Sequence, residues 1–214
     1  MSNPSFLITR PNHDLVTNYL YTWTEVIIKN AKNRNTVIYD LKKGKANKSI
    51  LDSYIKKNNP NIVLFNGHGN ADKITGINNE VLIEINKDEK LLSGKIIYAR
   101  SCRSAKRLGI SCVRNGATAF IGYKEDFILI STPEKATKPL TDTIAGYFLE
   151  PSNLVIQTLL KGNSPKESHE RSQLDSVKKI KHLLSENATS EEKSLLSFLW
   201  RNMKAQVLIE NNSL

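Results

Sequence analysis

Short apolar runs that alternate with helical patterns constrain the fold of this chain more than any other feature. The segment from Leu15 to Ala31 carries apolar residues at three- and four-residue spacing, which marks one face of a helix. Apolar runs of strand length lie at 6–9, 36–39, 61–65, 95–99 and 117–122. Buried strands that alternate with helices are typical of a parallel sheet with helices on both faces. The sequence therefore predicts an α/β sandwich with a mostly parallel central sheet.

The other segments complete this one-domain interpretation. Further helices are expected over 50–57 and 103–115. Residues 189–192 have the spacing of a capping box, which predicts a last helix from there to about residue 203. A hairpin arm is expected at 80–85, short strands at 127–130 and 205–209, and a loop at 131–139. No internal repeat interrupts the pattern. We expect a single domain over 1–214, with a core at about 5–170 and a helical extension at about 171–214.

Composition excludes several classes of protein. No apolar run reaches the roughly 18 residues of a membrane span, and the amino terminus lacks the pattern of a signal peptide. We therefore expect a cytoplasmic protein without membrane contact. The two cysteines, Cys102 and Cys112, are too few for a disulfide framework. No CxxC or HExxH motif is present, so neither a metal nor another cofactor is expected.

The chain is basic, with 31 Lys and Arg against 21 Asp and Glu, a net charge of +10. Basic residues concentrate at 29–48 and at 95–107. Such surfaces can bind nucleic acid or an acidic protein. The first cluster lacks the interleaved aromatic residues of a single-strand binder, which favours a solvated lysine-rich face. Nucleic acid is therefore a disfavoured partner.

Two short motifs follow buried strands and carry the chemistry. Asn66-Gly67-His68-Gly69 follows the run at 61–65, and Arg100-Ser101-Cys102 follows the run at 95–99. Parallel strands gather their carboxyl ends at one edge of the sheet, where ligands bind. A thiol beside an imidazole is a nucleophile beside its base. His68 and Cys102 are therefore predicted to meet over one cleft as catalytic residues.

Each of these residues also has a simpler interpretation. A histidine between glycines can be a turn residue, and most buried cysteines only fill space. Cys102, however, stands at the start of the helix expected over 103–115, among several cations. Both features lower the pKa of a thiol. Cys112 falls in the middle of that helix and is interpreted as packing.

At these residues the chain resembles the caspase-like cysteine peptidases, the clan that also holds gingipains, metacaspases, separases and CHAT domains. The resemblance covers about residues 5–170 and is closest in pattern to the CHAT and gingipain-type members. Residues 116–122 look like the next core strand of those domains, and 159–168 like their late helix-Gly-helix segment. The caspase signature Gln-Ala-Cys-x-Gly is absent. The resemblance implies a caspase-like three-layer sandwich.

The resemblance also implies a thiol protease, a hydrolase that cuts protein or peptide substrates through an acyl-enzyme. Cys102 would attack the peptide carbonyl, and His68 would protonate the leaving amine and later activate water, as a Cys-His dyad. The backbone N–H groups of Gly69 and Cys102 would form the oxyanion hole, worth about 3 kcal/mol per donor. The family requires no third member.

Substrate preference is inferred from three charged residues. In the clan, the residue two before the cysteine often lines the pocket for the side chain preceding the cut, and here it is Arg100. Arg10 stands at the exit of the first strand. Two guanidiniums at one pocket would favour an acidic side chain. Asp14, one turn further, would either neutralise Arg10 or bind a basic residue itself.

Other classes of function remain open. A catalytically silent domain of the same fold would dock an acidic protein or a nucleic acid through its basic face. A nucleic-acid-associated protein would show steeply salt-dependent binding. Acyl transfer or amide hydrolysis of a small molecule would use the same cysteine. A regulatory protein partner, or the loop at 123–139, would control access to the thiol.

Overall fold

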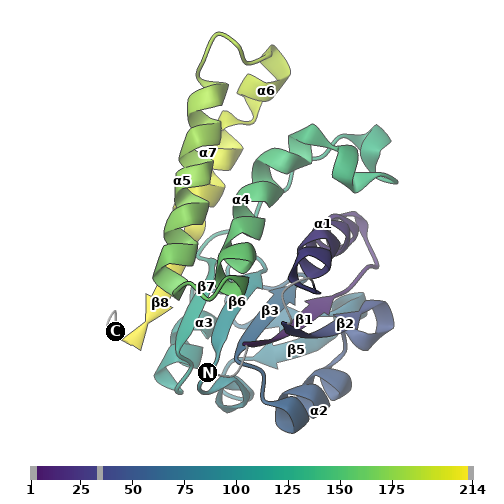
Figure 1. The fold of residues 1–214 in the computed structure, drawn as a ribbon, viewed down its shortest axis with the longest axis vertical. Helices are drawn as coiled ribbons and strands as arrows, with labels where there is room; N and C mark the ends of the chain where they lie inside the picture. Colours follow the sequence, from purple (N-terminus) through teal and green to yellow (C-terminus); the bar gives the residue numbers. More distant parts are fainter. Residues whose placement is uncertain (1–3, 33–35, 212–214) are drawn as a thin grey trace.

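The computed structural model describes residues 4–32 and 36–211 and shows a sheet covered by helices (Figure 1). Residues 33–35 of the first basic segment lie outside the described ranges. The strands are β1 (Ser5–Arg10), β2 (Val37–Lys42), β3 (Ile62–Asn66), β4 (Lys73–Thr75), β5 (Val81–Glu84), β6 (Ile96–Arg100), β7 (Ala119–Tyr123) and β8 (Gln206–Glu210). The α-helices are α1 (Leu15–Lys32), α2 (Lys48–Asn58), α3 (Leu108–Arg114), α4 (Thr143–Leu160), α5 (Pro165–Leu183), α6 (Ser190–Ser194) and α7 (Leu196–Ala205).

The main sheet has six strands in the order β2-β1-β3-β6-β7-β8. The first five are parallel, and β8 runs antiparallel to β7 at the edge. A separate antiparallel hairpin joins β4 and β5, where the sequence predicts a hairpin arm. The chain continues from β1 to β2 on one side and reaches β3 on the other. The order of the strands therefore reverses between β1 and β3, a position where α/β sheets bind ligands.

Alternating side chains on the strands form two cores, one on each face of the sheet. Leu7, Val63 and Ile97 face α2 and α3. Their neighbours in sequence, such as Leu64 and Tyr98, face α1 and α4. This alternation is the two-residue period of a strand. It confirms the predicted three-layer α/β sandwich.

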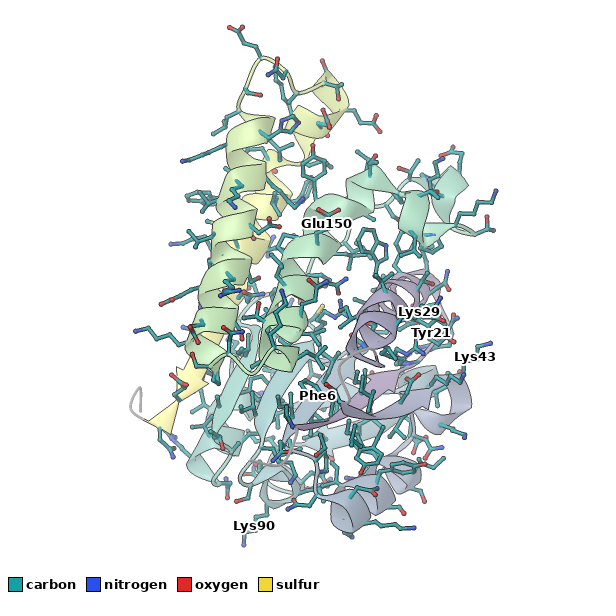
Figure 2. All side chains as sticks on the ribbon, viewed as in Figure 1. Phe6, Tyr21, Lys29, Lys43, Lys90 and Glu150 are labelled. Carbon is teal, nitrogen blue, oxygen red and sulfur yellow. The ribbon has the colours of Figure 1, made fainter. Side chains whose placement is uncertain are left out.

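The carboxyl-terminal helices pack on α4 and extend away from the sheet (Figure 1). Phe148 on α4 shares an apolar cluster with residues of α5 and α7. Lys179 on α5 also forms an ion pair with Glu150, at 2.5 Å. Figure 2 shows Glu150 among these helices, far from the exposed Lys43 and Lys90.

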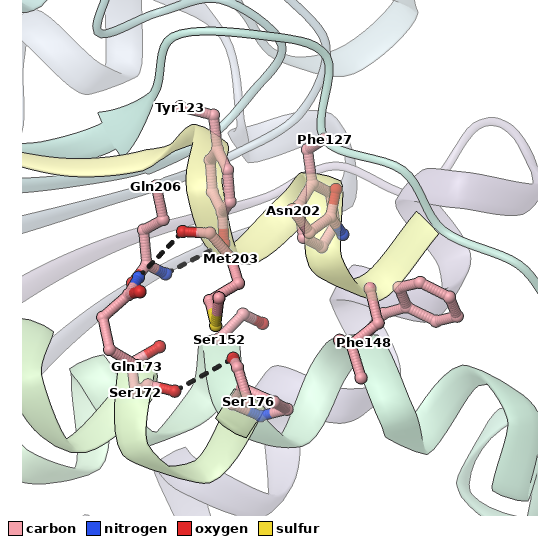
Figure 3. A pocket seen from close by; sticks show the side chains of 12 residues that line it. Tyr123, Phe127, Phe148, Ser152, Ser172, Gln173, Ser176, Asn202, Met203 and Gln206 are labelled. Carbon is pink, nitrogen blue, oxygen red and sulfur yellow. Dashed lines mark hydrogen bonds between the residues drawn. The ribbon is translucent and has the colours of Figure 1, made fainter. Parts of the chain in front are cut away.

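A small cavity with both polar and apolar walls lies between these helices and the sheet (Figure 3). Its volume of about 10 Å³ is enough for about one water molecule. Gln173 donates to the Met203 carbonyl at 3.1 Å, and Ser176 donates to the Ser172 carbonyl at 3.0 Å. These polar groups are satisfied within the protein, so the cavity belongs to the packing.

The segment after β6 differs from the prediction in one respect that matters for the site. The helix expected from residue 103 begins only at Leu108. The amide of Arg103 donates to the Glu125 carbonyl at 3.1 Å, and that of Ala105 to the Tyr123 carbonyl at 3.1 Å. Because these amides bond to another segment, the chain forms turns instead of a first helical turn. Cys102 is therefore not at a helix amino terminus.

Two smaller expectations also need correction. Residues 127–130 form no strand, and the last helix is divided at Leu195 into α6 and α7. The strand expected at 205–209 is β8. Among the described residues, no helix combines the length and hydropathy needed to cross a membrane.

Candidate active site

The register of the sheet brings the two predicted motifs to one edge. Asn66, the last residue of β3, pairs with Arg100, the last residue of β6. His68 and Cys102 each follow two residues later. The Ser101 hydroxyl donates a hydrogen bond to the His68 carbonyl at 2.7 Å. The two motifs therefore lie side by side and are linked directly.

The glycines of the first motif are required by close approach. Gly67 has a φ of +153°, and a Cβ there would collide with the Thr75 carbonyl. A Cβ on Gly69 would collide with the Ser101 hydroxyl. Only glycine leaves room for the hairpin and the second motif to pack this closely.

His68 is held by the carboxylate of Asp14, which the sequence analysis expected to neutralise Arg10 or to bind substrate. Its Nε2 lies 2.6 Å from Oδ2 of Asp14. The other carboxylate oxygen, Oδ1, accepts a hydrogen bond from the Thr17 amide at 2.8 Å and so caps the start of α1. Burial acts to raise the pKa of Asp14, but the hydrogen bonds from Thr17 and His68 outweigh burial and lower it. Asp14 is thus an ionised partner that fixes one ring nitrogen of His68.

Cys102 is in a less reactive state than the sequence predicts. Burial raises the pKa of its thiol, and the carboxylate of Asp126 adds to the increase. The guanidinium of Arg103 is bound to Asp126 at 2.7 Å and opposes this increase in the pKa only in part. The thiol lies 4.0 Å from the Phe127 carbonyl. The expectation of a lowered thiol pKa is therefore wrong for this conformation.

The segment beside the thiol is anchored from the carboxyl-terminal helices. The Ile128 amide donates to the side chain of Asn202 at 2.8 Å, and Asn202 donates back to the Ile128 carbonyl at 2.6 Å. Asn202 belongs to α7 and is itself buried. The position of the Phe127 carbonyl beside Cys102 therefore depends on α7 as well as on the sheet.

Arg100 lies in the interior, and the expectation that it lines a substrate pocket is wrong. Its side chain is fully buried. Nε donates to Asn66 at 2.7 Å and Nη1 to Asn153 at 2.6 Å, while Nη2 donates to Thr24. All three nitrogens thus have partners among the described residues, and the guanidinium joins β6 to β3, α1 and α4.

Arg10 is likewise engaged within the protein. Its side chain is 3 % exposed, and Nε and Nη2 bind both carboxylate oxygens of Asp40 at 2.8 Å and 2.6 Å. The guanidinium also lies 4.3 Å from the centre of the ring of Tyr21, a residue of α1 that Figure 2 labels. Arg10 and Arg100 therefore do not form a pair of free cations at one pocket, and Asp14 contacts His68 instead of neutralising Arg10.

Two backbone amides at the site remain available. Among the described residues, neither the Gly69 N–H nor the Cys102 N–H donates to a protein acceptor. Each belongs to one of the two motifs. They have the free donor capacity that an oxyanion hole needs.

His13 is the residue that the sequence analysis missed. It precedes Asp14, and its Nε2 lies 3.4 Å from Asp14 Oδ2. The rings of His13 and His68 meet edge to face, with centroids 6.0 Å apart. No motif spacing indicates this contact, because the two histidines are distant in sequence. The available signal was the His-Asp pair, which comes three residues after the end of β1, at the edge where β3 also ends.

Comparison with known proteins gives a match in fold. No protein-family model matches the chain, and neither does any curated protein. Among solved structures, a secreted C11 cysteine protease from Bacteroides thetaiotaomicron, in complex with an irreversible peptide inhibitor, matches with a TM-score of 0.52 and 14 % identity. The match covers 84 % of this chain and 60 % of that chain. The C11 proteases belong to the caspase-like clan, so this chain has a caspase-like α/β fold.

Proposed function

We propose that this chain is a cysteine endopeptidase in which Cys102 is the nucleophile and His68 the acid and base. The observation that carries the proposal is the direct link between the two motifs, with His68 bound to Asp14 on its other side. The fold supports it, because a structure of similar fold is a cysteine protease bound to a peptide inhibitor. A closer relation to the CHAT and gingipain-type members is part of the same proposal.

The reaction uses the ring nitrogen that Asp14 leaves free. Nδ1 of His68 removes the proton from Cys102, and the sulfur bonds to the carbonyl carbon of the substrate. The N–H groups of Gly69 and Cys102 stabilise the developing oxyanion. His68 then gives the proton to the leaving amine as the C–N bond breaks. Water, activated by His68, hydrolyses the acyl-enzyme and restores the thiol.

Asp14 acts in this scheme as a positioning residue. By accepting from Nε2, its carboxylate fixes the tautomer and the orientation of the ring. Asp14 is in turn held by the Thr17 amide and hydroxyl, at 2.8 Å and 2.9 Å. The Cys-His pair thus works with a supporting carboxylate. In this proposal Asp14 acts on His68 and does not bind the substrate.

The preference for an acidic residue before the cut loses its structural basis. Both guanidiniums on which it depended are bound inside the protein. We expect peptides ending in Asp or Glu to be cut no faster than matched peptides ending in Arg or Lys. Faster cleavage after the acidic residues by about tenfold or more, equal to about 1.4 kcal/mol, would restore the preference.

The decisive experiment is labelling with a thiol-reactive peptide electrophile, followed by mapping of the modified residue. Cys102 should be modified. Cys112 provides an internal control, because it is fully buried and burial raises its pKa to about 12. Replacing Cys102 with Ala should remove both labelling and turnover while circular dichroism stays unchanged. Modification of Cys112, or of neither cysteine, would refute the mechanism.

The raised thiol pKa favours one second candidate, a catalytically silent domain that docks an acidic partner. The basic side chains of Lys29 and Lys43 are exposed, as such a surface requires (Figure 2). The Cys102→Ala variant separates the two functions. A docking domain keeps its function in this variant, and a peptidase loses it.

A further inference from the structure

Three side chains at the reversal point of the sheet form a group that the peptidase mechanism uses only in part. His13 and Asp14 follow β1, and His68 follows β3. One potential ligand atom from each residue lies within 4.8 Å of those of the other two. The mechanism above needs the contact between Asp14 and His68, and it leaves His13 without a task.

His13 is the unusual member of this group. Its side chain is 13 % exposed, and neither ring nitrogen has a hydrogen-bond partner among the described residues. Its Nε2 approaches Asp14 Oδ2 at 3.4 Å without the geometry of a hydrogen bond. A buried polar group without a partner is costly and calls for an explanation. A metal ion would supply the missing partner.

The donor set suits one class of metal. Two imidazoles and one carboxylate, with a fourth position left for water, are a common ligand set for Zn²⁺. Ligand atoms around a tetrahedral zinc lie about 3.4 Å apart, given metal-ligand bonds of about 2.1 Å. The contact between His13 and Asp14 already has this length. The contact between His68 and Asp14, now 2.6 Å, has to lengthen when an ion enters.

The two carboxylate oxygens of Asp14 have different partners, and this arrangement suits a metal ligand. Oδ1 is committed to α1 through Thr17, while Oδ2 faces both histidines. The hydrogen bonds at Oδ1 fix the orientation of the carboxylate, as the supporting bonds of metal ligands do. Asp14 can thus bind an ion through one oxygen without releasing the start of the helix.

We propose that His13, Asp14 and His68 form a binding site for Zn²⁺, and that the bound ion switches the peptidase off. Binding depends on these three residues alone, whereas inhibition rests on the proposed function. Neutral imidazole has one lone pair, and a metal at Nε2 of His68 uses it. Nδ1 then carries the proton and cannot accept another from Cys102. The switch therefore acts on the base and leaves the thiol unligated.

Binding is tested with Co²⁺, which reports the ligand set by its spectrum. The full chain should bind one Co²⁺ and show the visible bands of a tetrahedral ion, without the near-ultraviolet band of a thiolate ligand. Competition with a chromophoric chelator then gives the affinity for Zn²⁺. Absence of binding, or a spectrum with a thiolate band, would overturn the proposal.

Variants separate this site from other ligands. His13→Ala and Asp14→Asn should each weaken Zn²⁺ binding by about tenfold or more, whereas Cys102→Ala should bind as the wild type does. His182→Ala is the matched control, because His182 lies on α5 and pairs with Glu192. Asp14→Asn keeps a good helix cap, so it serves if His13→Ala fails to fold. Unchanged binding in both His13→Ala and Asp14→Asn would refute the site.

Inhibition is measured separately with a peptide substrate. Each protein is compared with its own metal-free rate, and the Zn²⁺ concentration for half inhibition should follow the measured affinity in the wild type and in His13→Ala. Zinc that binds without inhibiting would refute the switch and leave the site standing. A chain that binds zinc but cuts no peptide at all would refute the proposed function alone.

Discussion

The two halves of the candidate site differ in how ready they are to react. On the His68 side, a half-exposed imidazole is already held by an ionised carboxylate. On the Cys102 side, the thiol is partly buried, has a raised pKa and lies 4.0 Å from the Phe127 carbonyl. The proposed base is thus preorganised, whereas the thiol of the proposed nucleophile is partly shielded. In this fold, order at the strand ends does not by itself produce a reactive thiolate.

The largest expected effect tests whether the protected thiol is the nucleophile at all. Cys102→Ala should lower the turnover of a peptide substrate by about a thousandfold or more, because the proposed acyl-enzyme forms on this sulfur. Cys112→Ala is the matched control, since Cys112 lies on α3 and is buried in the core cluster between α3 and the sheet. Equal loss in both variants would mean that the effect comes from folding.

The next effect concerns the buried cation beneath the Cys102 side. Arg100→Met should lower the free energy of unfolding by about 3 kcal/mol, since it leaves buried acceptors on Asn66 and Asn153 without donors. Urea unfolding measures the change. An Arg100→Met protein of normal stability with an altered residue preference would return Arg100 to the substrate pocket.

Asp14→Asn tests the readiness of the His68 side. The turnover number should fall by about a hundredfold with little change in KM, because Asn cannot fix the imidazole as the carboxylate does. Steady-state kinetics on one peptide resolves the two constants. A change confined to KM would instead make Asp14 a substrate-binding residue, as the sequence first indicated.

The protection of the thiol should be visible in its pH dependence. Because the folded state raises the pKa of Cys102, alkylation by iodoacetamide should be slow at neutral pH and increase with pH beyond the ordinary thiol value of about 8.5. Asp126→Asn should raise the rate at neutral pH by a few fold, since it removes a carboxylate that raises the pKa. A full rate already at neutral pH would contradict the protected state.

The smallest effect is the contribution of Asp14 to stability. Its pKa is lowered by folding, so the contribution is complete above the unfolded value and is lost as the pH falls through the folded value. The difference in melting temperature between wild type and Asp14→Asn should therefore shrink as the pH falls below about 4, the ordinary value of an aspartate. A constant difference over this range would mean that the charge of Asp14 is not involved.

Much of the fold was predictable, because the signals are local. The apolar runs gave the parallel strands, and the spacing in 15–31 gave α1. The equal offset of His68 and Cys102 from paired strand ends also follows from the motifs alone. The start of α3 could not be predicted from local sequence, because the amides of Arg103 and Ala105 bond to a distant segment. Tertiary hydrogen bonds replaced the local preference there.

The errors at the two arginines have a simple geometric origin. Side chains two apart in a strand share a face. Arg100 follows Tyr98, and Arg10 follows Ile8, and both of these apolar residues face α1 and α4. Because side chains alternate between the two faces of a strand, both guanidiniums lie on the face that the helices cover. The resemblance to known motifs predicts that Arg10 and Arg100 line a pocket, whereas the two-residue period of the strands places both side chains in the interior.

The double hydrogen bond between Asn202 and Ile128 has a consequence for kinetics. If a local opening that separates this pair also exposes more of the partly buried Cys102 thiol, both changes share one equilibrium. The exchange rate of the Ile128 amide with solvent deuterium and the rate of thiol modification should then report one event. A structural change at α7 would then reach the segment beside Cys102 through the side chain of Asn202.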